Sequence, residues 1–359
     1  MKMAVIVEAV CLLTIVAISM KHNSILSEIF NNQESKFAMR NVAQNQVEEE
    51  YIKWVDFNVS YEALETAYNL DVETYKTKHH VNFIELLAYT AAKNGGTFPS
   101  TSSREIQETG EALSVGTTTM ETLTLDMKYY PYYLEAYTAV LGGYVGEYEI
   151  QVENDSTSQP TYEKKYGLMA FSPIAKGFPY CDYDDFGVSR TYGYARPHLG
   201  HDFLGAIGTP IIAVESGYIE AIGWNQYGGW RIGIRSFDKK RYYYYAHLRQ
   251  NYPFREGLKE GSTVTAGDVI GYMGHTGYSK TENVNNIDSV HLHFGIQLIF
   301  DESQKEGNSE IWIDPYQLVR FLCKNRTEAL KVGESKEWRR VQEMKDPAVE
   351  KNRQEEEKR

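Results

Sequence analysis

Cysteine is scarce in this chain: three residues in 359, with no two of them in a C-x-x-C spacing. Cys11 lies in an apolar N-terminal run, which leaves Cys181 and Cys323 as the only pair that could form a disulfide. This scarcity excludes a disulfide framework and a zinc site of the thiolate type. A zinc site in this chain must therefore be built from histidine and carboxylate side chains.

Positive charge is also in short supply. The chain has 37 Lys and Arg residues against 49 Asp and Glu residues, which gives a formal net charge of -12. Proteins that bind phosphate backbones need a basic face, so we expect no nucleic-acid partner. The contents of 42% hydrophobic and 24% charged residues are typical of globular proteins, and 359 residues are enough for two domains.

A full-length membrane-spanning run is missing at the N-terminus. The apolar stretch at residues 4–19 contains a glutamate and is shorter than the ~20 residues of a spanning helix. One lysine precedes it, and Ala17 and Ser19 offer the small side chains that a signal peptidase reads. Residues 1–20 therefore predict export, either as a cleaved signal peptide or as a retained signal anchor. The polar residues 21–50 predict a linker.

Two different patterns follow this linker. Residues 51–165 carry helical patterns such as "VNFIELLAYTAAKNGG", in which apolar residues recur at helical spacing before a Gly-Gly stop. Residues 166–322 carry short runs rich in Ile, Val and Tyr that end at glycines, which is typical of antiparallel strands. We predict an α+β fold, with an N-terminal helical domain followed by a mostly antiparallel β-sheet domain. Residues 323–359 predict a charged tail, and its last residues, "EKNRQEEEKR", are expected to be solvated and partly disordered.

Six of the nine histidines fall in the predicted β-domain. The segment "HLGHD" supplies His198 and Asp202, and the segment "YAHL" supplies His247. In "HLHFG", His291 and His293 alternate with apolar residues, so in a strand both imidazoles lie on one face. A catalytic zinc takes three protein ligands and leaves a fourth position for water, and two histidines with a carboxylate are a workable set. Each fragment alone is a weak signal, but together they predict a metal site.

These three motifs resemble those of the lysostaphin-type (LytM/LasA-like) zinc endopeptidases, which cut peptide bonds in bacterial peptidoglycan. The family pattern of H-x-G-x-D, then Y-x-H-L, then H-L-H-F stands here as "HLGHD", "YAHL" and "HLHF", within about residues 185–320. The resemblance implies one Zn2+ per chain and a role for each motif residue. His198, Asp202 and His293 would ligate the zinc, while His247 and His291 would be catalytic histidines that are not ligands.

Two further histidines match no motif of this family. His201 lies inside "HLGHD" and is expected to line the site without binding metal, and His275 lies in a Gly-rich loop. The resemblance also leaves open which of His247 and His291 is the general base.

The function that the resemblance implies is zinc-dependent hydrolysis of peptide bonds in peptidoglycan. One alternative is a catalytically silent envelope scaffold or amidase regulator with the same fold, although such relatives usually lack a ligand and here all three are present. A second alternative is a binding module that grips wall peptides through Tyr242–Tyr245. The bond that is cut stays open between a Gly-rich cross-bridge and a direct stem-peptide link.

The helical residues 51–165 lie outside the resemblance and show no metal-ligand or acid–base spacing. We expect them to form a separate, non-catalytic unit that contacts envelope proteins, and we expect a fragment beginning near residue 166 to keep hydrolytic activity. Together with the predicted export, the resemblance places the folded part at the outer face of the cytoplasmic membrane or in the cell wall of a bacterium. Only the N-terminal segment would then contact the membrane.

Overall fold

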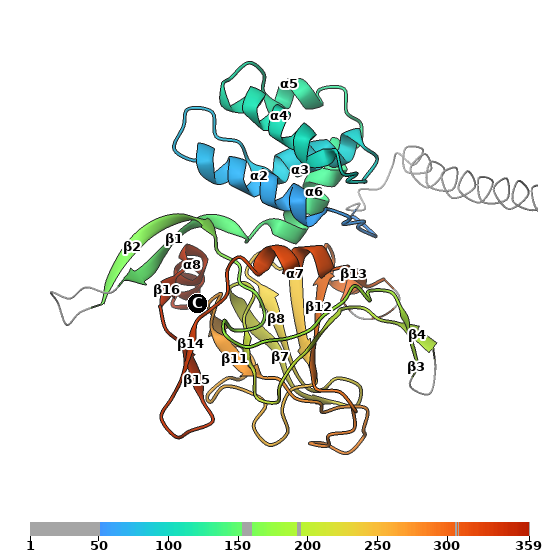
Figure 1. Ribbon diagram of the computed structural model, residues 1–359, viewed down its shortest axis with the longest axis vertical. Coiled ribbons are helices and arrows are strands. Elements are labelled where there is room, and N and C mark those ends of the chain that lie inside the picture. The colour runs from blue at the N-terminus through green and yellow to red at the C-terminus, as the bar shows by residue number, and fades with distance from the viewer. Residues whose placement is uncertain (1–50, 153–159, 192–194, 306, 308, 359) are drawn as a thin grey trace, which may run out of the picture. The chain divides into compact units, whose positions relative to one another are not determined.

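The computed structural model describes residues 51–152, 160–191, 195–305, 307 and 309–358. The predicted export segment and linker lie outside these ranges, so both stay predictions. Within the described ranges, no helix is long and apolar enough to cross a membrane. Residues 52–359 form one compact unit, in which a layer of helices packs beside the β-sheets (Figure 1).

The helical layer is formed by α2 (Tyr61–Thr74), α3 (Phe83–Lys93), α4 (Ser102–Ser114), α5 (Met120–Thr124) and α6 (Tyr130–Leu141). Polar side chains start three of these helices. Those of Ser60, Asn82 and Thr119 accept hydrogen bonds from backbone N–H groups of the first turn, which would otherwise lack partners. The apolar faces then meet around fully buried side chains such as Leu64 and Leu86.

A seven-stranded antiparallel sheet forms the centre of the second layer, in the order β10-β7-β8-β9-β12-β13, with β5 paired to β12. Its strands are β5 (His201–Leu204), β7 (Gly217–Asn225), β8 (Gly229–Ser236), β9 (Arg241–Ala246), β10 (Thr263–Val264), β12 (His291–Leu298) and β13 (Ile311–Ile313). The predicted α+β fold, with helices first and a mostly antiparallel sheet after them, is confirmed.

Smaller elements surround this sheet. They are the long hairpin β1 (Val145–Val152) and β2 (Thr161–Leu168), the pairs β3 (Ser189–Thr191) with β4 (Ala195–Pro197), β6 (Pro210–Ile212) with β11 (Val269–Tyr272) and β14 (Ala329–Lys331) with β15 (Trp338–Arg340), the 3-10 turn η2 (Glu302–Gln304), the helices α7 (Tyr316–Leu322) and α8 (Pro347–Glu356), and β16 (Met344–Lys345).

The two faces of the central sheet differ in what they contact. Successive residues of a strand point to opposite faces, so Leu292, Phe294 and Ile296 of β12 are fully buried in the core. His291 and His293 alternate with them and therefore lie on the other face. The alternation seen in the sequence thus places the apolar residues of β12 in the core and the two histidines on the opposite face, where they can bind a ligand.

Residues 326–346, in the first part of the predicted charged tail, fold against the rest of the chain. β16 pairs with β1 and joins the hairpin in a three-stranded sheet. Met344 is buried in one cluster with Phe171, and Nη1 of Arg340 donates to the carbonyl of Ala266 at 2.8 Å. A charged composition does not exclude such packing, because the charge of a buried arginine can be satisfied by backbone carbonyls while its stem packs on apolar groups.

A buried ion pair joins the helical layer to the central sheet. Arg241 of β9 is 1% exposed and contacts both carboxylate oxygens of Glu215, at 2.7 and 3.0 Å. Its Nη1 donates to the carbonyl of Ala139 at the C-terminal end of α6, at 2.6 Å, and Tyr243 donates its hydroxyl proton to Glu215. The domain boundary near residue 166 stays a prediction, but the two layers share this polar contact and a continuous apolar core.

We expect Glu215→Gln to destabilise the chain, because Arg241 would keep its buried positive charge without a compensating carboxylate. The expected loss is about 3–5 kcal/mol in the free energy of unfolding, measured by urea denaturation of the full chain. Glu149→Gln is the control, because Glu149 meets Lys345 at the surface, where an ion pair contributes only about 0–1 kcal/mol. Equal losses in the two variants would contradict the role given to the buried pair.

Candidate metal centre and active site

The register of β12 against β5 brings the predicted metal ligands together. His293 lies directly opposite Asp202 in the antiparallel ladder, on the face away from the core. His198 comes between β4 and β5 and reaches the same place. Nε2 of His198, Oδ1 of Asp202 and Nδ1 of His293 lie 2.9 or 3.0 Å from one another. Three ligand atoms from two segments therefore converge on one point.

Steric crowding explains why position 200, in "HLGHD", is a glycine. A Cβ atom at Gly200 would lie 2.6 Å from Cε1 of His293 and 2.7 Å from the carbonyl oxygen of Phe294. A side-chain carbon cannot lie that close to other heavy atoms, so only glycine allows the backbone of this loop to contact the imidazole of His293. The spacing of His198 and Asp202 in the motif depends on that close approach.

The three donor atoms fit a zinc ion in chemistry and in spacing. Nδ1 of His198 lies 3.2 Å from both the carbonyl oxygen and Oδ2 of Asp185, so its proton is held there and Nε2 keeps a lone pair. Oδ2 of Asp202 lies 3.6 Å from Arg190, which leaves Oδ1 to face the histidines. A tetrahedral zinc with bonds of about 2.0 Å needs ligand atoms about 3.3 Å apart, close to the spacing found.

The charges of these groups favour a ligating carboxylate. Burial alone would raise the pKa of Asp202, but hydrogen bonds with His198 and His293 outweigh it and hold the pKa well below its ordinary value. Burial acts to lower the pKa of His198, but the hydrogen bond and charge of Asp202 and the charge of Asp185 outweigh it, so the pKa is raised. Burial lowers the pKa of His293. Asp202 is therefore an anion at neutral pH.

His247 and His291 form a second pair beside these three residues. Their ring centroids are 4.8 Å apart. Nδ1 of His247 lies 2.9 Å from the carbonyl oxygen of Thr276, and Nδ1 of His291 lies 2.9 Å from that of Ser289, so in each ring Nδ1 is the donor and Nε2 is free to exchange a proton. Nε2 of His291 lies 3.9 Å from Oδ1 of Asp202.

The backbone of His247 is held in an unusual conformation. Its φ of 63° lies in the left-handed region, which residues other than glycine rarely adopt and which is enriched at active sites. Its backbone N–H donates to Gly228 and its carbonyl accepts from Gly274, so both neighbours fix it. Burial and the nearby charges of His291 and His293 lower the pKa of His247 well below its ordinary value, so at neutral pH the ring is uncharged.

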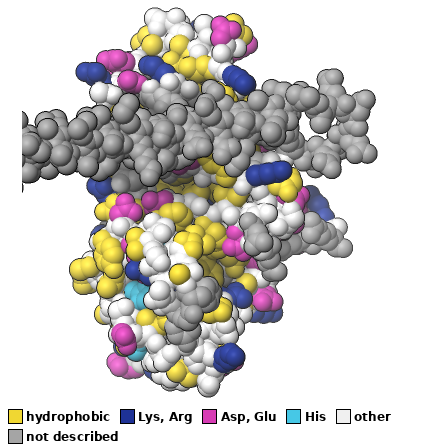
Figure 2. Space-filling model, turned by 90° about the vertical axis from the view of Figure 1, so that its right-hand side faces the viewer, with side chains coloured by type: hydrophobic (Ala, Val, Ile, Leu, Met, Phe, Trp, Pro, Cys, Tyr) yellow, Lys and Arg dark blue, Asp and Glu magenta, His cyan; other side chains and the backbone are white. Residues whose placement is uncertain are grey.

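All five predicted site residues line one pocket on the free face of the sheet. Figure 2 shows histidine side chains reaching the surface of the sheet part of the molecule. Among the other residues that line the pocket, sequence reasoning missed Arg190, Arg196 and Tyr278, and it named Tyr244 only as part of a binding module. It also missed Asp185. No spacing rule identifies these residues, although arginines flanking "HLGHD" in an acidic chain were a usable signal.

Two histidines lie elsewhere. The prediction that His201 lines the site is wrong, because it alternates with Asp202 along β5 and points to the opposite face. There it is 1% exposed, with Nε2 3.0 Å from Oδ2 of Asp182. Nδ1 of His275 lies 2.7 Å from the carbonyl oxygen of Ile287, and His275 is not among the residues that line the pocket.

The segment that carries this site is similar to known proteins. The model of peptidase family M23 matches residues 196–306, the segment that carries all three motifs. This segment is an M23 peptidase domain.

Several curated proteins and solved structures are similar to this chain. The chain is 35% identical over 161 residues to the L-Ala--D-Glu endopeptidase of Bacillus subtilis, which is 44% of this chain and 46% of that protein. It is 40% identical over 98 residues to lysostaphin of Staphylococcus simulans, which is 27% of this chain and 17% of that protein. A solved structure of a candidate glycyl-glycine endopeptidase lytM from Ruminococcus gnavus shares 25% identity, with a TM-score of 0.46, over 74% of this chain and 90% of that one. The chain thus spans less than half the length of these two curated relatives.

A larger hollow of the M23 domain adjoins the pocket and is called the groove below. It has a volume of about 480 Å³ and shares Arg196, Tyr244 and His293 with the pocket. The ring of Tyr244 lies between those of His293 and Trp312, with centroid distances of 6.0 and 6.3 Å. A Cβ at residue 295 would lie 2.7 Å from the Trp312 ring, so Gly295, the last letter of "HLHFG", makes room for that ring. The groove therefore begins at the metal centre and runs along the sheet.

Proposed function

We propose that this chain is a zinc-dependent endopeptidase that hydrolyses peptide bonds in bacterial peptidoglycan. One observation carries the proposal: Nε2 of His198, Oδ1 of Asp202 and Nδ1 of His293 converge within about 3 Å of one another beside two further histidines. Relatives of the M23 domain named as an L-Ala--D-Glu endopeptidase and a peptidoglycan DD-endopeptidase support the substrate class.

The five site residues divide into two roles. His198, Asp202 and His293 would hold the metal, with Asp185 and Arg190 fixing the orientation of the first two. When bound, Zn2+ would act as a Lewis acid and lower the pKa of a water toward roughly 7. Nε2 of one free imidazole, that of His247 or His291, takes a proton from the attacking water and returns it to the departing amine. The other imidazole, in its protonated form with hydrogen on both ring nitrogens, donates a hydrogen bond from Nε2 to the developing oxyanion.

The alternatives of a silent scaffold and a plain binding module are less well supported. Either could keep the fold, but neither needs three ligand atoms at zinc spacing. Nor does either need the strained backbone of His247, which aims an imidazole into the same pocket. Strain of this kind persists where surrounding structure holds it, and it is concentrated at active sites.

The test is hydrolysis by the purified full chain. Incubation with isolated peptidoglycan is expected to release peptides with new amino termini, identified by mass spectrometry. A zinc chelator is expected to stop the release, and added Zn2+ is expected to restore it. Folded, zinc-loaded protein that binds the wall material but releases nothing would favour the silent scaffold or the binding module instead.

The proposed location follows from the predicted export segment. We propose that the folded part lies outside the cytoplasmic membrane, where it would meet this substrate, and that the helical layer offers a surface to envelope proteins. Protease added to intact cells is expected to degrade the folded part. Complete protection of the chain would place it inside the cell and contradict this location.

A further inference from the structure

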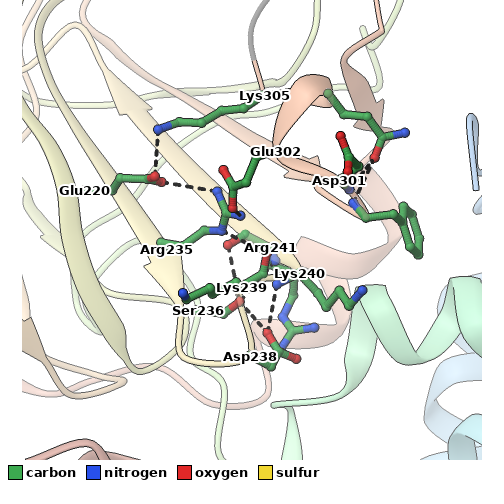
Figure 3. A network of polar contacts seen from close by, with 12 residues as sticks. Glu220, Arg235, Ser236, Asp238, Lys239, Lys240, Arg241, Asp301, Glu302 and Lys305 are labelled. Carbon is green, nitrogen blue, oxygen red and sulfur yellow. Dashed lines mark hydrogen bonds and ion pairs between the residues drawn. The ribbon is translucent and has the colours of Figure 1, made fainter. Parts of the chain in front are cut away.

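The cations that line the groove differ in how their charge is used. Nζ of Lys305 lies 2.6 Å from Oε1 of Glu220, so this charge is already paired. Figure 3 shows Glu220 between Lys305 and the buried Arg235. Glu310 stands at the rim, where it accepts a hydrogen bond from Trp312. Lys305 and Glu220 therefore contribute no net charge that a ligand could use.

Arg196 and Arg231 are different. Both are partly buried in the groove, and among the residues that the structure describes neither has a carboxylate partner. Within the described residues, the side chain of Arg196 donates a hydrogen bond to the hydroxyl of Tyr278, at 2.5 Å, and its Nε is buried without a hydrogen-bond partner. Taking a guanidinium partly out of water is costly unless something pairs with it. In a chain with a net charge of -12, two such groups in one hollow stand out.

The guanidinium groups of Arg196 and Arg231 belong to the same groove. Arg196, Arg231 and Tyr244 all line the groove. The ring of Tyr244 in turn contacts that of His293. Because Arg196 lines both the pocket and the groove, this positive charge lies next to the metal centre. An extended chain advances only about 3.3–3.6 Å per residue, so a group bound by these arginines belongs to a residue near the cleaved bond.

We propose that Arg196 and Arg231 bind a free carboxylate of the substrate. The substrate is then an acid-bearing stem peptide, with the carboxylate within about two residues of the cleaved bond, and not a neutral glycine cross-bridge. Guanidinium groups match carboxylates by planar, charge-assisted hydrogen bonds, and an uncharged glycine chain would leave both arginines unpaired. This inference rests on the proposed function and specifies its substrate.

The experiment compares three peptides with the zinc-loaded full chain. They are a stem peptide with a free side-branch carboxylate, the same peptide with that group amidated, and pentaglycine, all three amidated at the C-terminus so that no terminal carboxylate remains. We expect the acid to be cleaved about 10–100-fold more efficiently in kcat/KM than the amide, the range of a hydrogen bond to a charged group. Pentaglycine is expected to be the poorest substrate.

Variants test whether the arginines cause this preference. Arg231→Gln and, independently, Arg196→Gln are expected to lose most of the preference, because KM rises more for the acid than for the amide, while the zinc content stays unchanged. Arg339→Gln removes one charge from an exposed position outside the groove and is expected to keep the preference. Equal cleavage of acid and amide by wild type, faster cleavage of pentaglycine, or an undiminished preference in both folded variants would overturn the inference alone. Failure of wild type on every peptide and on whole peptidoglycan would count against the proposed function.

Discussion

Replacement of His198, Asp202 or His293 by alanine is expected to remove bound zinc and hydrolysis together. Each supplies one of three donor atoms that lie 2.9 or 3.0 Å apart, and two remaining donors are too few for a stable catalytic site. Metal analysis of the purified variants should show a large loss of zinc, and the release of peptides from peptidoglycan should fall to the level without enzyme.

His275→Ala is the matched control for these variants. It removes an imidazole of the same domain that binds a loop carbonyl and does not line the pocket, so zinc and activity should persist. If none of the three variants lost zinc relative to this control, the metal centre would lie elsewhere. If His291→Ala lost zinc while His293→Ala kept it, the roles within "HLH" would be exchanged.

Replacement of His247 or His291 by alanine is expected to give the opposite combination: near-stoichiometric zinc with a rate lowered by about 10²–10⁴-fold. Nδ1 of each ring is occupied by a backbone carbonyl, so only Nε2 is available to the reaction and neither ring is needed to hold the ion. Single-turnover hydrolysis of a defined peptide by zinc-loaded variants measures this loss.

The double variant sharpens this second test. The ring centroids of His247 and His291 lie 4.8 Å apart, and both rings serve one reaction. The fold-decrease in rate of the double variant should therefore be smaller than the product of the fold-decreases of the two single variants. Zinc loss in either single variant would show that the residue supports the metal. Full activity in either would remove that histidine from the chemistry.

The arrangement of β12 could be predicted from the sequence because a strand has a fixed period of two. The alternation in "HLHFG" was enough to place His291 and His293 on one face and to bury Phe294 on the other. The same logic, applied to β5, would have separated His201 from Asp202 and avoided the wrong prediction for His201. That step needed the knowledge that this segment is a strand paired with β12, which no local pattern supplies.

Contacts between segments that are far apart in the chain could not be predicted from the sequence. Asp185 reaches Nδ1 of His198 from a loop, and Arg190 reaches Asp202 from the β3 strand. Arg241 of β9 meets the end of α6 across about a hundred residues. Such pairs depend on how whole elements pack, and a single sequence offers no periodicity or spacing from which to infer them.

The pairing of β16 with β1 has a consequence for how the chain is made. Glu149 and Lys345 meet although 196 positions separate them, and a ribosome adds residues from the N-terminus onward. One edge of β1 therefore stays open until residue 345 has been synthesised, and an open strand edge invites association with other chains. A chain truncated before residue 344 keeps that edge open, whereas a chain that contains β16 closes it with its own residues.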